Sequence, residues 1–368
     1  MKKILIISGI VLGACCLLVL LLVGGYALYL QLSYNRIPDY VHLSTENNPG
    51  NVLEPETTYT AVTYNIGFGA YEPTYTFFMD TGRMKDGTPT QGQYSRAFSE
   101  ERVIANTQTS RSILQSLDSD FYLLQEVDTD STRSYHVNQV NMMIEEFTGY
   151  GSVYTNAFHS PYLFYPILSP HGLVNSGLLT LSRYHIEENL RRSLPIDNGF
   201  ITRLTDLDRC FTISYVPVQN DKMLSLITLH LTAYDEGGTI RKQQLDMLLD
   251  VMEEEYAKGN YVIAGGDFNH DIASTIELFP SQQEIPDWVY ALSPEDLRSH
   301  FSFVIPDNYD EVPSCRGADI PYEEGVTYTV TVDGFIVSDN VEATSQVIST
   351  DFISSDHQPV KLSFRLLD

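Results

Sequence analysis

The first thirty residues of the chain are almost uniformly apolar. After Lys2 and Lys3, no charged residue occurs from Ile4 to Leu30, and the next charge is Arg36. About 20 apolar residues span the hydrocarbon core of a bilayer, so this segment predicts one transmembrane helix. The lysines on its N-terminal side favour a cytoplasmic N-terminus. We therefore expect a single-pass protein of the cell membrane whose main body lies on the extracellular side.

Two other interpretations of this apolar segment remain open. Leu12-Gly13-Ala14-Cys15 resembles a lipobox, with Cys15 as the lipidated residue, and a cleaved secretory signal is the second alternative. A signal peptide has an apolar region of about 7–15 residues, which is shorter than this one. The residues after Cys15 also stay apolar, where a lipoprotein would have a polar tether. The transmembrane anchor is the interpretation we prefer.

The pattern changes after a polar, proline-containing segment at 37–57, which we interpret as a stalk. Apolar residues recur at helical spacing over 99–117 and 239–258, and both ranges are predicted as helices. Clusters of β-branched and aromatic residues predict strands. These lie at 59–64, 121–124, 177–181, 210–218, 224–231, 261–264, 326–332, 335–337 and 360–364.

Many of the predicted strands follow one another without a helix between them. This order is typical of an α+β fold with two sheets packed together and helices outside. Three long stretches, 66–98, 155–176 and 297–325, show no regular pattern but are rich in aromatic residues. We expect them to be ordered loops that determine specificity. The predicted organisation is an anchor at 1–36, the stalk, and one catalytic domain at 58–368.

Charge and cysteine content narrow the choice of function. The chain carries 22 basic and 48 acidic residues, a net charge of −26. Such a balance argues against general binding to nucleic acid or to anionic lipid, both of which require lysine and arginine. Outside the apolar segment the cysteines are Cys210 and Cys315, and whether they form a disulfide stays open. The chain has no CxxC motif, which argues against a thiolate metal site.

Candidate chemistry lies where predicted strands end. Carboxylate and amide oxygens suit Mg²⁺, Mn²⁺ or Ca²⁺, and histidines can hold a phosphoryl oxygen or protonate a leaving group. The sequence has no P-loop, no Gly-x-Ser-x-Gly and no HExxH motif. The set therefore indicates metal-assisted attack of water on a phosphoester. Its members are Asn65, Glu126, His230, Asp267, Asn269, Asp333, Asp356 and His357.

Seven short motifs occur in the order seen in the endonuclease/exonuclease/phosphatase (DNase I-like) superfamily, and the chain resembles that family over about residues 58–366. They are Thr63-Tyr64-Asn65-Ile66, Leu124-Gln125-Glu126, Gly177-Leu178-Leu179-Thr180-Leu181-Ser182-Arg183-Tyr184, Thr228-Leu229-His230-Leu231, Gly266-Asp267-Phe268-Asn269, Val332-Asp333-Gly334-Phe335-Ile336 and Ser355-Asp356-His357-Gln358-Pro359-Val360. The resemblance implies a four-layer αββα sandwich and a magnesium-dependent phosphoric ester hydrolase, with Mn²⁺ or Ca²⁺ as other possible ions.

The same resemblance implies a role for each site residue. Glu126, Asn65 and Asp356 correspond to metal ligands. Asp267 corresponds to the residue that orients or deprotonates the attacking water, and Asn269 to a phosphate-binding amide. His357 corresponds to a histidine that contacts the scissile phosphate and is oriented by Asp333, and His230 to a candidate general acid.

Two departures separate the chain from apurinic endonucleases and place it closer to the DNase and sphingomyelinase branches. Gly67 stands where apurinic endonucleases have an aspartate, and His230 stands where they have no histidine. The preferred function is a membrane-anchored phosphodiesterase or phosphatase, acting as a monomer on a small phosphoester such as a lipid head group. An extracellular nuclease and a catalytically inactive binding module are the alternatives.

Overall fold

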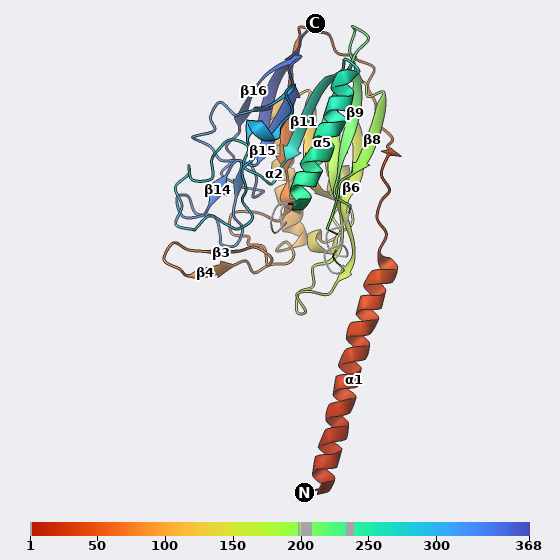
Figure 1. Cartoon of the computed structure of the whole chain (residues 1–368), viewed down its shortest axis with the longest axis vertical. Helices are drawn as coiled ribbons and strands as arrows, with labels where there is room; N and C mark the ends of the chain where they lie inside the picture. The colour runs from red at the N-terminus through yellow and green to blue at the C-terminus, as the bar shows by residue number, and fades with distance from the viewer. Residues whose placement is uncertain (1, 198, 200–207, 233–238) are drawn as a thin grey trace.

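The computed structural model describes residues 2–197, 199, 208–232 and 239–368. Its first element, α1 (Lys2–Ser33), projects from the rest of the molecule (Figure 1). The stretch Lys3–Ser33 is long and apolar enough to cross a membrane, by length and composition, and most of it is exposed. The predicted apolar helix is therefore present.

The body of the chain consists of two main sheets. The six-stranded sheet has the order β16 (Val341–Val347), β17 (Val360–Leu366), β2 (Thr58–Asn65), β5 (Phe121–Asp128), β7 (Gly172–Ser182), β6 (Gly151–Leu163). The seven-stranded sheet has the order β1 (Val41–His42), β8 (Glu188–Ser193), β9 (Cys210–Pro217), β10 (Met223–His230), β11 (Tyr261–Asp267), β15 (Asp333–Ser338), β12 (Phe301–Val304).

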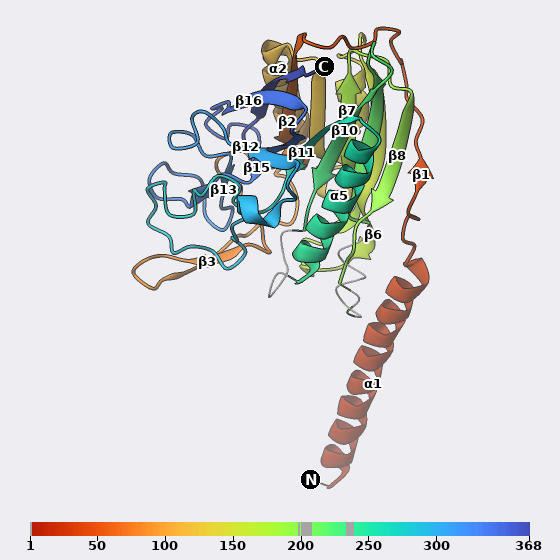
Figure 2. The same cartoon turned by 45° about the horizontal axis from the view of Figure 1, so that its top comes forward.

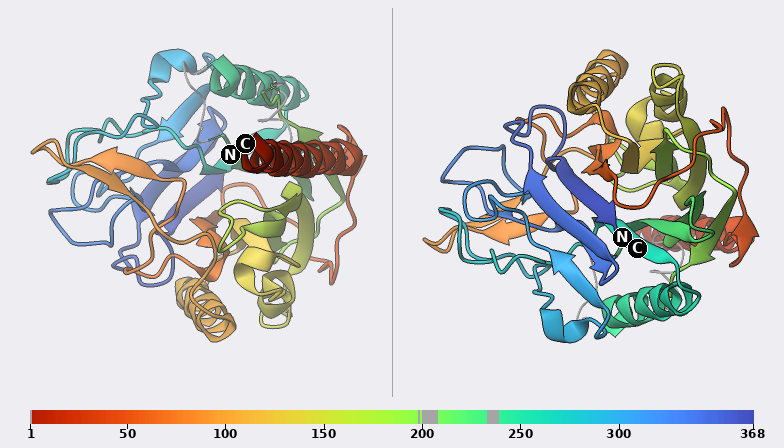
Figure 3. Two further views of the ribbon diagram at one scale, coloured as in Figure 1. Left: turned by 90° about the horizontal axis from the view of Figure 1, so that it is seen from below. Right: turned by 90° about the horizontal axis from the view of Figure 1, so that it is seen from above.

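The two sheets pack face to face, with helices on both outer faces (Figure 3). Between the sheets lies an apolar core to which both contribute, including Leu123, Leu226 and Phe335. Apolar residues of α2 (Glu100–Leu117) and α3 (Gln139–Ile144) cover the outside of the six-stranded sheet, and those of α5 (Thr239–Ala257) cover the outside of the seven-stranded sheet. The predicted α+β sandwich with two packed sheets is confirmed.

All three irregular stretches contain more regular structure than the sequence indicated, and β12 lies within 297–325. The prediction of a loop over 155–176 is wrong, because β6 and β7 form a long antiparallel hairpin there. Prolines and bulges interrupt its alternation, which hid the strands. The strand predicted over 326–332 is also largely wrong, since only β14 (Thr329–Val330) is extended, paired with β13 (Cys315–Arg316). The stretch 66–98 holds η1 (Gly67–Gly69), β3 (Thr81–Arg83) and β4 (Pro89–Gln91).

Residues 37–57, predicted as a stalk, lie along the body in this structure. β1 pairs with β8, and Leu53 is fully buried beside Val218. The division into anchor, stalk and catalytic domain stays a prediction. Cys210 and Cys315 are both buried and are not joined to each other, so the disulfide that the sequence left open is absent.

The strand directions determine where a site can form. β2 and β5 are parallel neighbours in one sheet, and β10 and β11 are parallel neighbours in the other. The carboxyl ends of these strands lie at one end of the sandwich, toward which the arrowhead of β11 points. The helix α1 projects from the same end (Figures 1 and 2). This end of the sheets is called the strand-end edge below.

The close approach of β10 and β11 requires a glycine at position 266. A Cβ there would lie 2.0 Å from the carbonyl oxygen of Leu229, which is rigid backbone. We expect Gly266→Ala to lower the free energy of unfolding by about 1–3 kcal/mol, as overpacking does. Gly149→Ala is the matched control, because its Cβ meets nothing within 4 Å. Urea unfolding of the detergent-solubilised chain measures both, and equal midpoints would contradict this account of the β10–β11 contact.

Candidate active site

The pairing of strands brings the predicted site residues together at the strand-end edge. Asn65 at the end of β2 is the partner of Gln125 in β5. In the other sheet His230 pairs with Asp267, and Asp267 pairs with Asp333. The side chains of Asn65, Asp267 and Asp333 are almost completely buried. The two sheets therefore each deliver part of one site.

A hydrogen bond between the amide of Asn65 and Asp267 joins the two halves. Asn65 Nδ2 donates to Asp267 Oδ2 over 3.0 Å and also lies 3.4 Å from Glu126 Oε1. The orientation of the amide is fixed because its Oδ1 accepts from the backbone N–H of Gly67 over 3.0 Å. Asn65 thus links the carboxylates of Glu126 and Asp267, which come from different sheets.

Glu126 reaches the site through a distortion of β5. The pairing of β5 with β7 shifts register between Leu124 and Val127, and Glu126 has a φ of 52°. A left-handed conformation in a non-glycine residue costs on the order of 1–3 kcal/mol and is often found at functional sites. Glu126 Oε2 lies 3.5 Å from Arg133 Nη2, so the carboxylate faces both an amide and a cation. This bulge directs a charged side chain out of a buried strand.

Arg133 is itself held rigidly. Its Nε and Nη2 donate to the two oxygens of Asp128 over 3.1 and 3.0 Å, and its guanidinium lies 3.8 Å from the centre of the Phe68 ring. Asp128 has no exposed surface, and its negative charge raises the pKa of Arg133 although burial opposes this. Arg133 is therefore a permanent positive charge beside Glu126.

His357 lies within hydrogen-bonding distance of Asp333. Asp333 Oδ2 lies 2.8 Å from His357 Nδ1 and accepts a hydrogen bond from Ser314 Oγ over 2.7 Å. Burial alone would lower the pKa of His357, but Asp333 and the other nearby negative groups raise it well above its usual value. His357 is thus an imidazolium at neutral pH whose Nε2 points toward Asp267, 3.6 Å away.

Asp267 lies between two imidazoles with different protonation states. Its Oδ2 is 3.3 Å from His230 Nε2, and its Oδ1 accepts from the backbone N–H of Asn269 over 2.8 Å. Burial raises the pKa of Asp267 to about 7, with the charge of His357 opposing the rise. Burial lowers the pKa of His230 well below its usual value, so this ring is neutral at pH 7. Asp267 is therefore a carboxylate able to exchange a proton near neutral pH.

Asp356 approaches Asn65 and Glu126 from the loop that precedes β17. Ser355 Oγ donates to the backbone oxygen of Asn65 over 2.7 Å, which fixes the loop against β2. Burial raises the pKa of Asp356 to about 6, and Glu126 contributes to the rise. Gly67 is adjacent: a Cβ there would lie 2.7 Å from the ring of Tyr71 and 3.1 Å from Asp356 Oδ1. A side chain at position 67 is therefore excluded sterically.

Asn269 lies at the edge of the group. It has a φ of 51°, which asparagine tolerates better than most residues, and its Nδ2 donates to the backbone oxygen of Leu231 over 2.9 Å. An amide nitrogen has two hydrogens, so one donor remains for a ligand. All eight predicted site residues thus lie at the strand-end edge.

The donor set fits a hard divalent cation. Glu126, Asp267, Asp333 and Asp356 place four carboxyl groups at one buried edge, and burial raises the pKa of Asp267 and Asp356. A cation would stabilise the ionised form of such carboxyl groups. Oxygen atoms of Asp267 and Asp333 and a nitrogen of His357 lie within 4.8 Å of one another. The short contact between Asp333 and His357 Nδ1 favours an orienting role for that pair. The assignment of Glu126, Asp356 and Asn65 as metal ligands stays a prediction.

Sequence reasoning missed several residues that support the site. Arg133 and Ser314 stand in no recognisable motif, and they are close to the site only through tertiary contacts. Arg316 is almost completely buried, and its charge lowers the pKa of Asp356 against the effect of burial. Cys315 Sγ lies 3.7 Å from His357 Nε2, but burial raises the pKa of this thiol to about 12. The thiol therefore stays protonated and is a poor nucleophile.

Comparisons with known proteins give the family and the fold of the chain. Residues 62–357 match the profile of the Endonuclease/Exonuclease/phosphatase family, which covers most of the chain and every predicted site residue. A search of curated protein sequences finds no match.

Solved structures of similar fold include three that span most of the chain. TDP2 from C. elegans has a TM-score of 0.53 at 13% identity, over 84% of this chain and 76% of that one. A family protein from Leptotrichia buccalis has a TM-score of 0.54 at 13% identity, over 84% and 100%. ANGEL2, described as a 2′,3′-cyclic phosphatase, has a TM-score of 0.52 at 17% identity, over 89% and 99%. At these identities the likeness shows the fold; the predicted placement near DNases and sphingomyelinases stays a prediction.

Binding of a divalent cation predicts a measurable stabilisation. At a free Mg²⁺ concentration 100 times its Kd, the free energy of unfolding rises by about 2.7 kcal/mol through mass action. We expect Glu126→Gln to lose most of this gain, as measured by thermal unfolding with and without Mg²⁺. The matched control is Glu342→Gln. Glu342 pairs with Arg365 at the start of β16, which is the end of that strand away from the strand-end edge. Equal stabilisation of the two variants would contradict the assignment of Glu126.

Proposed function

The chain belongs to the endonuclease/exonuclease/phosphatase family, and from this premise we propose that it is a hydrolase of phosphoesters that depends on a divalent cation. The observation that carries the proposal is the position of Asp267. This carboxylate, whose pKa is raised to about 7, lies between a neutral and a protonated imidazole and is held by Asn65. Such a group can accept a proton from water next to donors that stabilise a negatively charged phosphoryl group.

In the proposed reaction Asp267 orients a water molecule and takes up its proton as the water oxygen bonds to phosphorus. His357, fixed through Nδ1 by Asp333, donates from Nε2 to a phosphoryl oxygen. The remaining donor of the Asn269 amide contacts the same group. The bond from phosphorus to the ester oxygen breaks, and the leaving oxygen takes a proton. Direct attack by water is consistent with the protonated state of the Cys315 thiol.

His230 is the proposed donor of the proton to the leaving oxygen. Burial keeps its pKa low in the ligand-free protein. A negatively charged phosphoester beside the ring would raise the pKa, because a nearby anion favours the imidazolium. This role therefore depends on bound substrate.

Mg²⁺ is the proposed cation, held by Glu126, Asp356 and Asn65, and Mn²⁺ or Ca²⁺ also suits these oxygen ligands. When bound, the ion would polarise a phosphoryl oxygen and offset the charge that develops on it. The proposed substrate class is a small phosphoester, in particular a phosphorylated lipid head group. The net charge of −26 disfavours long nucleic acids.

We further propose that α1 anchors the chain in the cell membrane, with the body on the extracellular side as a monomer. The support is the length and apolar composition of Lys3–Ser33 and the lysines at its N-terminal end.

Activity on phosphoesters tests the proposed roles. We expect hydrolysis of bis(p-nitrophenyl) phosphate or of a phospholipid to be abolished by EDTA and restored by Mg²⁺. His357→Ala should lower kcat/KM by about 10²- to 10⁴-fold, the range for loss of a positioned proton donor. Assays against sphingomyelin, phosphatidylinositol phosphates, simple phosphodiesters and DNA identify the substrate class.

A matched control is available at the other end of the molecule. His300 Nδ1 lies 3.1 Å from Asp339 Oδ2, so it also forms a histidine–aspartate pair, but it is half exposed and remote from the strand-end edge. His300→Ala should leave kcat/KM unchanged. Hydrolysis that survives EDTA, or equal effects of the two histidine substitutions, would refute the proposed mechanism.

The proposed orientation in the membrane is tested by chemical labelling. Thr148 is exposed on the body, whereas Cys210 and Cys315 are buried. We expect a membrane-impermeant maleimide to label Thr148→Cys on intact cells, with the parent chain as the background. Labelling of this variant only after the cells are permeabilised would place the body in the cytoplasm.

A further inference from the structure

The hairpin formed by β6 and β7 extends past the strand-end edge. Within the sheet, Asp128 at the end of β5 pairs with Ser176 of β7. The hairpin continues beyond this point to the pair Leu163 and Gly172. Figure 1 shows the resulting yellow-green turn reaching beyond the rest of the sheet, beside the C-terminal part of α1. The tip of this hairpin is defined here as Phe164–Leu168.

The tip is apolar and strongly exposed. Phe164 and Tyr165 are 55% and 68% exposed, and Ile167 and Leu168 are 84% and 100% exposed. No lysine, arginine, aspartate or glutamate occurs between Glu146 and Arg183, although the whole chain has a net charge of −26. A contiguous apolar surface of this kind marks a site of contact with another apolar phase.

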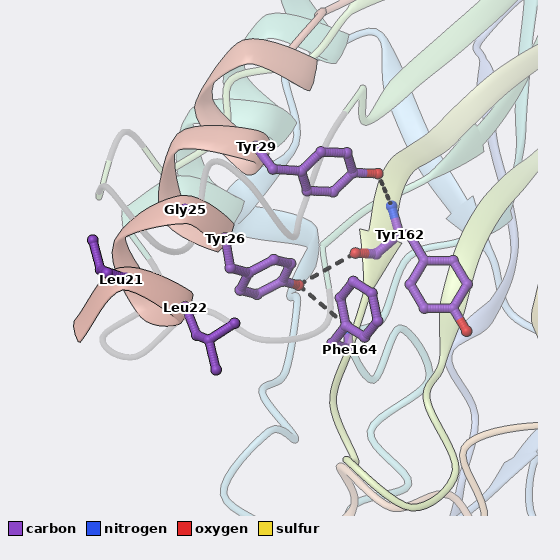
Figure 4. A pocket seen from close by; sticks show the side chains of 7 residues that line it. All are labelled: Leu21, Leu22, Gly25, Tyr26, Tyr29, Tyr162 and Phe164. Atoms are coloured by element: carbon purple, nitrogen blue, oxygen red, sulfur yellow. Dashed lines mark hydrogen bonds between the residues drawn. The ribbon is translucent and has the colours of Figure 1, made fainter. Parts of the chain in front are cut away.

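The base of the tip contacts α1 directly. Tyr29 Oη accepts a hydrogen bond from the backbone N–H of Tyr162 over 3.0 Å. Tyr26 Oη accepts from the N–H of Phe164 over 3.1 Å, and the Tyr26 and Phe164 rings meet edge to face at 5.4 Å. Leu21 and Leu22 line the same groove (Figure 4). From Tyr162 to Phe164 the hairpin therefore runs along α1 toward its N-terminus.

The length of α1 gives the depth of this contact. The apolar stretch has 31 residues. A hydrocarbon core about 30 Å thick needs only about 20 helical residues. If the hydrocarbon core begins at the lysines at the N-terminal end of α1, it would end near Val23. Tyr26 and Tyr29 would then lie in the outer interfacial layer, where tyrosine is enriched. Phe164 contacts Tyr26, so the tip lies at the depth of the lipid head groups and the outer ends of the acyl chains.

We propose that the tip Phe164–Leu168 is a second membrane contact, which inserts into the leaflet around α1 and holds the strand-end edge against the head groups of that leaflet. The inference rests on the proposed anchoring by α1, and it deepens the proposed function by making a phosphoester in the head-group layer the substrate. The acidic body has little electrostatic attraction for anionic lipid, so an apolar contact is the kind that can hold it at the surface.

Quenching by brominated lipid tests the insertion. The full chain is reconstituted in vesicles of phosphatidylcholine with or without bromine on the acyl chains. Trp288 is the one tryptophan of the chain, so every variant carries Trp288→Phe. We expect the fluorescence of Ile167→Trp to be quenched by the brominated lipid, as is that of the reference Leu12→Trp inside α1.

Val52→Trp serves as the matched control. Val52 is 38% exposed, and the next residue, Leu53, donates a backbone hydrogen bond to Pro217 at the end of β9. Pro217 pairs with Met223 at the start of β10, whereas His230 lies at the end of β10, so Val52 is at the opposite end of the sheet from the site. Its fluorescence should not respond to bromine. The proposal is overturned if Ile167→Trp is quenched no more than Val52→Trp while Leu12→Trp is quenched. A blue-shifted emission of Ile167→Trp without quenching also overturns it, because protein, such as a second copy of the chain, would then cover the tip.

Activity tests the second half of the proposal. Ile167→Asp combined with Leu168→Asp should lose hydrolysis of phospholipid in vesicles and keep hydrolysis of soluble bis(p-nitrophenyl) phosphate, and Val52→Asp should keep both. If the double variant hydrolyses phospholipid in vesicles as well as Val52→Asp does, the proposed orientation of the site is wrong. A parent chain that hydrolyses neither substrate would refute the proposed function instead, and the quenching result would still decide the insertion.

Discussion

One hydrogen bond between the two sheets holds the candidate site together. Asn65 ends a strand of the six-stranded sheet, Asp267 ends a strand of the seven-stranded sheet, and the amide joins them over 3.0 Å. A hydrogen bond to a charged group contributes about 1.5–3 kcal/mol, but its positional effect matters more here. This hydrogen bond requires the sheets to pack so that the ends of β2 and β11 lie next to each other. The apolar core between the sheets, with Leu123, Leu226 and Phe335, fixes that alignment.

Two positive groups of the site face carboxylates on either side of this link. Arg133, fixed by Asp128, faces Glu126, and the imidazolium of His357, fixed by Asp333, faces Asp267. Glu126 and Asp267 thus each have a fixed positive partner, yet burial still raises the pKa of Asp267 and Asp356. Since the same edge faces the side from which α1 projects, one arrangement connects the chemistry of the site to its proposed position at a membrane surface.

The sequence predicted those parts that depend on local patterns. Ser99 caps α2 by accepting from the N–H of Arg102, and the helix lies where the spacing of apolar residues predicts it. Site residues such as Asp267 were found because short motifs follow buried strands. Arg133 and Ser314 were not found, since their partners Glu126 and Asp333 are brought to them only by the fold. The β6–β7 hairpin was missed because bulges and prolines disturb its alternation. The role proposed for its apolar tip depends on the contact with α1, which only the fold creates.

The location of a bound cation tests the central claim most directly. Anomalous diffraction from crystals of the chain soaked in Mn²⁺ would show where a divalent ion binds. The account predicts one strong peak beside the Glu126 carboxylate, on the side of Asp356 and Asn65, with the contact between Asp333 and His357 Nδ1 intact. A peak held by Asp333 and His357, with none beside Glu126, would contradict it.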